Sequence, residues 1–428
     1  MSDRRTPKGS WLIVALLFLF MLINFVDKAV VGLAAVPIMQ ELDLTLRQFG
    51  LLGSSFFLLF SLSAVVTGFI VNRVQTRWVL AVMCLVWALT QFPMVGTVGF
   101  TTFLACRIAL GAGEGPAYPV ALHATYKWFP NELRTLPTAI VAQGAGVGLM
   151  VALPMLNWVI INYSWHRAFA VLGVVGLVWT GAWLLLGREG AVVGSASSTA
   201  TGMPDRISYA RLLCSPTVLS SWCAFFGAYW GLSLAIAWQA AFLIKGLGFA
   251  QGSIGLLSAL PSGVSVVLLI AAGWYSQHLL ARGVSSWMAR GVFGGGCVAL
   301  GGIAMLIMPH MPTIPLKIAM TTIGISLPSV IYVFSHAVVS EVTPVAQRGA
   351  LLAIGNAVGT SAGLLAPYIM GSVIETAATP LDGFNTGYVI CGIIMLIGGI
   401  IGMALMHPEW EAMRWTPEIP EQAAIRSA

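Results

Sequence analysis

The sequence predicts an all-α integral membrane protein with twelve transmembrane helices in two six-helix halves. Of its 428 residues, 58% are hydrophobic and only 8% are charged, whereas soluble domains carry about 25% charged residues. Apolar stretches recur along the whole chain, and each is close to the roughly 20 residues that a helix needs to cross a bilayer. A polar stretch near the middle of the chain separates two sets of these segments. A soluble domain on a single membrane anchor is therefore excluded.

Twelve spans follow in order. Six precede the polar stretch, at about 12–36, 48–71, 78–98, 100–122, 136–160 and 166–187. Six follow it, at about 214–244, 252–278, 286–308, 313–339, 348–373 and 385–406. The first segment is longer than the apolar core of a signal peptide, and no small-residue cleavage site follows it, so we interpret it as a retained span.

The polar stretch from Gly190 to Ser208 is rich in Ser, Thr, Gly and Ala, a composition typical of linkers. We therefore expect an N-terminal half at 1–189, a cytoplasmic linker at 190–211 and a C-terminal half at 212–428. The halves repeat one motif, since a Pro-x-x-x-Arg segment precedes both span five and span eleven. Parallel repeats with a site at their interface are common in secondary transporters.

The basic residues that give the chain its net charge of +6 lie mostly on one side of the predicted membrane spans. Most Lys and Arg residues lie in loops on one side, and only Arg47, Lys245 and Lys317, with Arg167 at the end of span six, lie on the other. Positive loops stay in the cytoplasm, which predicts that both termini are cytoplasmic. We expect no nucleic-acid partner. The six cysteines lie singly, without metal or redox spacing, and there is no phosphate-binding loop, so we expect no metal, no cofactor and no enzyme.

Four charged residues fall inside apolar segments: Asp27 and Lys28 in span one, and Arg107 and Glu114 in span four. Each costs at least ~2.5 kcal/mol at the bilayer centre, so such residues face a polar cavity or a partner. Ion pairs that merely hold the N-terminal half together are the structural alternative. Such pairs contribute little net stability when buried, which favours a functional role.

Other polar side chains recur at helical spacing and predict a shared cavity. These candidates are Tyr118 on span four, Gln143 on span five, and Asn356 and Thr360 on span eleven. The C-terminal half offers Tyr229, Trp238 and Gln239 on span seven, and Tyr332 on span ten. Interhelical hydrogen bonding, packing or an interfacial aromatic belt is the alternative for these residues.

Several motifs resemble the major facilitator superfamily, and more narrowly its anion:cation symporter branch. They are Gly68…Asn72-Arg73…Arg77, Asn24-Phe-Val-Asp27-Lys28, Arg107…Gly111-Ala-Gly-Glu114-Gly-Pro116…Pro119, Trp128-Phe-Pro, and Arg348-Gly-Ala…Asn356…Gly359-Thr360…Gly363…Pro367. The resemblance implies transport of organic anions, commonly with protons. It also implies a cytoplasmic gating role for Asn72, Arg73, Arg77, Arg134 and Arg348. The chain departs from the branch at three positions. The branch usually has Arg at the position of Lys28, often Tyr at that of Phe25, and Asp at that of Asn72.

Charge arithmetic predicts a coupling mechanism. The two carboxylates, Asp27 and Glu114, and the two cations, Lys28 and Arg107, give the empty site a net charge of zero. A monoanionic substrate lowers that net charge to −1, and uptake of one proton restores it to zero. We expect a substrate carboxylate to engage Lys28 and to free Asp27 or Glu114, which then takes up a proton more readily. The predicted function is import of an aromatic or sugar carboxylate by a proton symporter, monomeric in a bacterial inner membrane. An exchanger or uniporter is the nearest alternative; a membrane sensor or membrane enzyme is more remote.

Overall fold

The computed structural model describes residues 9–70, 74–129, 133, 135–190 and 206–415, and all regular elements in these ranges are helical. The N-terminal helices are α1 (Ser10–Leu33), α2 (Ala35–Glu41), α3 (Leu46–Ser55), α4 (Phe60–Ile70), α5 (Thr76–Gln91), α6 (Phe100–Glu114), α7 (Ala117–Tyr126), α8 (Thr135–Asn162) and α9 (Trp165–Leu186). The C-terminal helices are α10 (Tyr209–Leu213), α11 (Pro216–Ala241), α12 (Gln251–Ala281), α13 (Phe293–Ile307), α14 (Ile314–Ser326), α15 (Val330–Val342), α16 (Val345–Thr360), α17 (Ala362–Thr376), α18 (Pro380–Leu405) and α19 (Pro408–Trp415). The all-α prediction is confirmed.

Eleven helical segments among the described residues are long and apolar enough to cross a membrane. The other predicted span, at about 100–122, is present as α6 and α7, which meet at Gly115–Pro116. This segment is a broken helix where we predict a continuous one, because proline cannot donate a backbone hydrogen bond within a helix. A Cβ on Gly115 would lie only 1.9 Å from the carbonyl oxygen of Phe60. The break therefore lets α4 approach the end of α6, where Glu114 lies.

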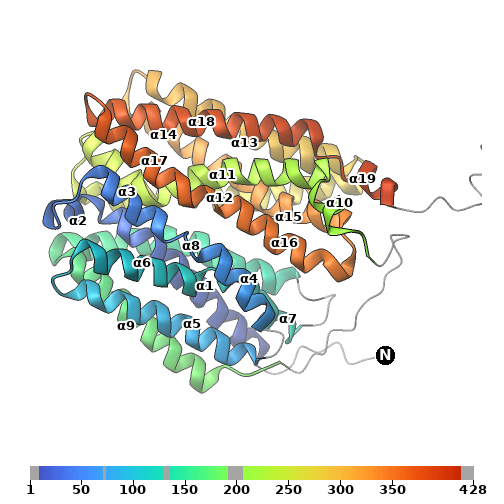
Figure 1. The fold of residues 1–428 in the computed structure, drawn as a ribbon, viewed down its shortest axis with the longest axis horizontal. Helices are drawn as coiled ribbons and strands as arrows, with labels where there is room; N and C mark the ends of the chain where they lie inside the picture. Colours follow the sequence, from blue (N-terminus) through green and yellow to red (C-terminus); the bar gives the residue numbers. More distant parts are fainter. Residues whose placement is uncertain (1–8, 71–73, 130–132, 134, 191–205, 416–428) are drawn as a thin grey trace, which may run out of the picture.

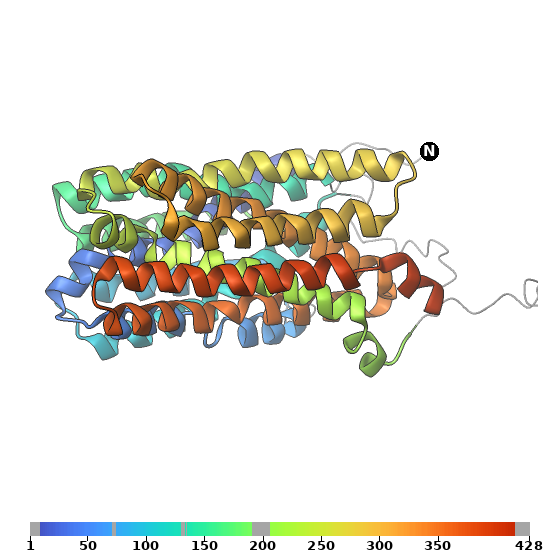
Figure 2. The same cartoon turned by 90° about the horizontal axis from the view of Figure 1, so that it is seen from above.

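The long helices run side by side along the longest axis of the molecule (Figures 1 and 2). We call α1–α9 the N-bundle and α11–α18 the C-bundle; they form the lower and upper parts of Figure 1. The start of α1 and α19 lie at the same end of the molecule, which we call the terminus end, and the opposite end is the distal end. The bundles meet mainly where α3 packs on α17, α8 on α12 and α1 on α11.

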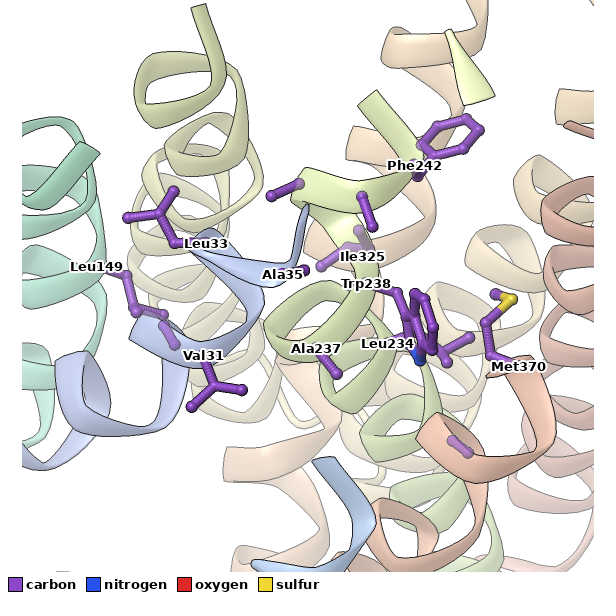
Figure 3. Close-up of a cluster of buried hydrophobic side chains, with 14 of the residues drawn as sticks. Val31, Leu33, Ala35, Leu149, Leu234, Ala237, Trp238, Phe242, Ile325 and Met370 are labelled. Carbon is purple, nitrogen blue, oxygen red and sulfur yellow. The ribbon is translucent and has the colours of Figure 1, made fainter. Parts of the chain in front are cut away.

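At the distal end the backbones of the two bundles touch. A Cβ added to Gly32 of α1 would lie 1.8 Å from the carbonyl oxygen of Ile236 on α11, and one on Gly50 of α3 would lie 2.5 Å from that of Pro367 on α17. Figure 3 shows apolar side chains of α1, α8, α11 and α17 in this region, including Val31 and Ala237. Small residues let helices pack this closely in a membrane, so the distal end is tightly sealed.

Hydrogen bonds add to this distal seal. The backbone N–H of Arg47 donates to Glu375 at 2.8 Å, and its Nε donates to the hydroxyl of Tyr368 at 2.7 Å. Asn157 of α8 and Gln251 of α12 exchange two bonds, at 2.9 and 2.8 Å. By contrast, the ion pairs described at the terminus end, Lys127–Glu189 and Arg290–Glu341, each join residues of a single bundle.

Candidate functional site

The four charged residues that the sequence places inside spans one and four converge in the middle of the N-bundle. Asp27, Lys28, Arg107 and Glu114 are each at most 4% exposed. Lys28 Nζ lies 3.4 Å from Glu114 Oε2, so α1 is tied to the last residue of α6. Since burial removes charged groups from water, each needs partners within the protein.

Asn24 joins the two partners of this ion pair. Its Oδ1 accepts a bond from Lys28 Nζ at 2.6 Å, and its Nδ2 donates to Glu114 Oε2 at 3.1 Å. Asn24 and Lys28 are four residues apart and share one face of α1. Sequence reasoning quoted Asn24 within a motif but did not include it among the site residues, although the four-residue spacing was a readable signal.

The other atoms of the cluster are unevenly satisfied. Nε and Nη1 of Arg107, Oδ1 of Asp27 and Oε1 of Glu114 are buried without a hydrogen-bond partner in the described structure. The carbon of the Arg107 guanidinium lies 4.8 Å from the ring centre of Phe56, and Lys28 Nζ lies 4.4 Å from that of Phe25. Aromatic faces attract cations but do not replace hydrogen-bond acceptors. Arg107 is therefore a buried cation with donors still unsatisfied.

A small cavity lies between the two bundles beside these cations. Its walls include Lys28 and Arg107, with Phe49, Phe56 and Phe57 from the N-bundle and Ser233, Ile236, Ala237 and Pro367 from the C-bundle. The cavity thus has positive charge on one side and apolar side chains elsewhere. Its volume is only about 10 Å³, about the space of one water molecule, so an organic anion can enter beside these cations only after the bundles move apart.

The predicted residues of the C-bundle fall into two groups. The ring of Tyr229 lies 5.8 Å from that of Phe57, a residue of the cavity wall, and 6.3 Å from that of Tyr332, so Tyr332 is one ring further from the cavity. Trp238 is fully buried, and its Nε1 donates to the carbonyl of Pro367 at 3.0 Å. Gln239 is 3% exposed and accepts a bond from the Tyr388 hydroxyl at 3.5 Å. Neither of these two side chains lines the cavity, although Trp238 packs against Phe49 of its wall.

The remaining predicted residues do not line this cavity. Thr360 of α16 bonds with Ser61 of α4 at 3.0 Å, where the bundles meet near mid-molecule. Gln143 and Asn356 are half-buried, and Tyr118 is 40% exposed on α7.

The predicted gating residues are only partly described. Asn72, Arg73 and Arg134 lie outside the described residues. Arg77 donates to the carbonyl of Leu184 on α9. Arg348 is half-buried on α16.

A carboxylate that the sequence did not single out organises the terminus end of the N-bundle. Glu189 accepts bonds from the hydroxyl and backbone N–H of Thr76, from the backbone N–H of Arg77 and from Lys127. Partial burial opposes ionisation of Glu189, but these donors outweigh it and lower its pKa below the usual 4.5. Glu189 thus fixes the ends of α5, α7 and α9 together. Its position next to Arg188 in a basic loop gave no signal of this role.

Known proteins resemble the chain over almost its whole length. The Major Facilitator Superfamily profile matches residues 17–367. A hexuronate transporter of Bacillus subtilis (strain 168) is 23% identical over 406 residues, covering 92% of this chain and 94% of that protein. A probable L-galactonate transporter of Escherichia coli (strain K12) is 25% identical over 417 residues, covering 92% and 88%.

Solved structures share the fold. A bacterial homologue of the human lysosomal transporter Spinster, inward-facing and unoccupied, matches with a TM-score of 0.78 and 17% identity over 96% of this chain and 100% of that one. A D-xylose–proton symporter matches with a TM-score of 0.76 and 14% identity over 93% and 98%.

Proposed function

The chain belongs to the Major Facilitator Superfamily, and we propose that this multi-pass membrane transporter imports a small organic carboxylate together with protons. The carboxylate class is supported by relatives whose names specify hexuronate and L-galactonate. We place the protein in a bacterial inner membrane, as a monomer, with the terminus end in the cytoplasm. The excess of Lys and Arg in loops at that end supports this orientation.

One observation carries the proposal: two unpartnered nitrogens of Arg107 are buried in the wall of a cavity between the bundles. A buried guanidinium without an acceptor is costly, and a carboxylate is the acceptor that best matches its geometry. Lys28, which the sequence led us to expect as the substrate ligand, is already bonded to Asn24 and Glu114. The incoming carboxylate therefore binds Arg107 first and then competes with Glu114 for Lys28.

Proton coupling follows from that competition. When the substrate draws Lys28 away, Glu114 loses its opposite charge while it stays buried. A carboxylate in that situation is stabilised by protonation. The substrate carries one negative charge and the proton one positive charge, so the loaded cluster has the same net charge as the empty one. Asp27, with its own unpartnered oxygen, is the second group able to hold the proton.

Alternating access then requires the distal seal to part. The loaded cluster is neutral, so the two bundles can rock around it without exposing an uncompensated charge to the bilayer. The contacts of Arg47 with Glu375 and Tyr368 break in that movement. Arg77 and Arg348, with Asn72, Arg73 and Arg134, serve the opposite gate at the terminus end.

The test is uptake into proteoliposomes of purified protein, with an imposed proton gradient and a panel of labelled aromatic and sugar acids. We expect gradient-dependent accumulation of one class. The substitution Glu114→Gln should abolish accumulation while exchange across the membrane persists. Asp43→Asn, an exposed carboxylate in a left-handed turn that asparagine also tolerates, is the matched control and should behave like the parent.

Three results would contradict the proposal in different ways. Accumulation by Glu114→Gln at the parental level would remove that residue from the coupling step. Entry that ignores the gradient would make the protein an exchanger or uniporter. Binding without any entry would make it a sensor.

A further inference from the structure

We propose that the rings of Phe25, Phe56 and Phe60 form an aromatic cage for the Lys28 ammonium. The cage keeps the ion pair of Lys28 with Glu114 loose enough for a substrate carboxylate to replace Glu114. The three phenylalanines are positioning residues, because they act on the substrate through Lys28. This role rests on the proposed function, in which the incoming carboxylate competes with Glu114 for Lys28.

Three aromatic rings lie against the Lys28 ammonium. Its Nζ is 4.4 Å from the ring centre of Phe25, 5.1 Å from that of Phe60 and 5.8 Å from that of Phe56. All three distances are within the roughly 6 Å over which a ring attracts a cation, and the attraction is strongest where water is excluded. Lys28 is 4% exposed, so the cage acts in such an environment.

The rings of the cage come from two membrane spans. Phe25 and Lys28 are three residues apart and share one face of α1. Phe56 directly follows α3, and Phe60 begins α4, so these two residues flank the break in the second span. Their ring centres are 5.4 Å apart. The break therefore presents two packed rings to the same ammonium that Phe25 faces from α1.

Two glycines of α6 let this break approach the charge cluster. A Cβ added to Gly111 would lie 1.7 Å from the carbonyl oxygen of Phe56. A Cβ added to Gly115 would lie 1.9 Å from that of Phe60. Glu114 is the neighbour of Gly115 in the chain, so one contact between α4 and α6 brings both the cage and the carboxylate to Lys28.

The Lys28 ammonium has more donors than acceptors. It carries three N–H donors, and the described structure offers it two acceptors, Asn24 Oδ1 at 2.6 Å and Glu114 Oε2 at 3.4 Å. The ring faces supply electron density for the third donor. An ammonium is a compact charge that can turn among such partners, whereas a guanidinium would bring five donors in a fixed plane. The cage therefore suits lysine at this position.

The ion pair in the cage is long. The 3.4 Å between Lys28 Nζ and Glu114 Oε2 exceeds the roughly 2.7–2.9 Å of a charge-assisted hydrogen bond. The same ammonium lies only 2.6 Å from Oδ1 of the neutral Asn24. The rings and Asn24 thus hold the cation away from Glu114. A substrate carboxylate has only this weakened contact to displace, and the ammonium keeps its ring partners during the exchange.

Phe56 also lies beside the second cation. The guanidinium carbon of Arg107 is 4.8 Å from its ring centre. Because one ring attracts both cations, an ammonium that is drawn toward Arg107 keeps an aromatic partner along the way.

Fluorination of one ring tests the cage with little change of shape. Fluorine withdraws electron density from the ring face, so mono-, di- and trifluorinated phenylalanine at position 25 should weaken the attraction in steps. We expect the melting temperature in detergent to fall with each fluorine. The series should be flat in the background Lys28→Met with Glu114→Gln, which removes both charges and leaves neither buried alone.

The same series at position 20 is the matched control. Phe20 also lies on α1, but its ring packs on those of Trp87 and Trp179, at 4.4 and 5.0 Å. The effect of its fluorination should be the same in both backgrounds. If the background without charges does not fold, a steeper fall for position 25 than for position 20 decides the test. A position 25 series that is flat with the charges present, or that falls equally in both backgrounds, would overturn the cage.

Uptake kinetics test the positioning role. Phe25→Leu lets the ammonium close on Glu114, so the KM for an acid that accumulates in the panel above should rise about 2- to 30-fold, the range to which one cation–π contact corresponds. Phe25→Tyr keeps an aromatic face and should keep the parental KM. In both variants kcat should stay near the parental value.

The outcomes separate the cage from transport. An unchanged KM in Phe25→Leu, or equal increases in Phe25→Leu and Phe25→Tyr, would overturn the positioning role and leave the proposed symport intact. If no acid of the panel accumulates in the unsubstituted protein, the proposed function falls and the positioning role falls with it. The melting series still decides in that case whether the cage exists.

Discussion

The substitution Gly32→Ala tests whether the distal seal controls access to the cavity. The added Cβ would lie 1.8 Å from the carbonyl oxygen of Ile236, whereas ordinary contact begins at 3.4 Å, so α1 and α11 must separate by about 1.6 Å (3.4 − 1.8). The Ile236 oxygen is a backbone atom and the Cβ is fixed directly to the α1 backbone, so no side-chain rotation can relieve the contact. Overpacking of this kind costs about 1–3 kcal/mol, and here the cost falls only on the conformation in which the distal end is closed. The equilibrium should therefore shift toward distal opening by about 5- to 150-fold.

A cysteine at Ser233 can report this shift. Ser233 is 1% exposed and lines the small cavity at the distal seal, together with Gly32 and Ile236. In Ser233→Cys the new thiol should react slowly with a membrane-impermeant maleimide supplied from the distal side. Adding Gly32→Ala should raise that rate about 5- to 150-fold.

The control is Gly181→Ala in the same Ser233→Cys background. Gly181 lies within α9, and an added Cβ there meets nothing within 4 Å. Gly181→Ala therefore gains the same helix propensity as Gly32→Ala, up to ~1 kcal/mol, but creates no clash with a neighbouring helix. An unchanged labelling rate in Gly32→Ala would refute the role of this contact as the seal.

Two further predictions concern the stability of the N-bundle. Asn24→Ala removes two hydrogen bonds to charged groups, each worth about 1.5–3 kcal/mol, so the melting temperature in detergent should fall clearly. The control Asn162→Ala should change the melting temperature little, because the Asn162 side chain is exposed and bonded to its own helix. Equal effects of the two substitutions would contradict the role of Asn24. The lowered pKa of Glu189 stabilises the fold above its ordinary value of 4.5 and loses that contribution as the pH falls through the folded value. The melting temperature should therefore decline on the acid side, and Glu189→Gln should flatten that part of the profile; parallel profiles would show that other groups cause the decline.

The spans were predictable because hydropathy depends only on composition and length, which the sequence states directly. The break at Gly115–Pro116 was less readable, since proline disfavours a helix interior but Pro154, Pro261 and Pro367 lie inside the continuous helices α8, α12 and α17. What composition could not give was the close packing of α4 against Gly115 that accompanies the break.

The cluster of buried charges was predictable as a set of residues and less so as an arrangement. Buried charges in spans one and four had to find one another, and Lys28 and Glu114 do. Which cation remains without a partner depends on the rotation of α1 and α6 about their axes, and the sequence does not specify that rotation. Trp238 illustrates the same limit, because its packing against Phe49 follows from the contact of α11 with α3 and α17.

The ion pair and the distal seal lie on the same helix, and this suggests how substrate binding reaches the gate. Lys28 and Gly32 are four residues apart, so they share one face of α1 and lie about 6 Å from each other along the helix axis. Lys28 holds Glu114 of α6, while Gly32 touches the backbone of α11. An anion that draws Lys28 toward Arg107 replaces Glu114, which is fixed on α6, by the bound anion, which can move, as the partner of α1. The contact at Gly32 permits no adjustment by side chains, so any resulting shift of α1 must move the contact between the bundles. Coupling between the charge cluster and the gate therefore requires no long pathway, since a single turn of α1 connects them.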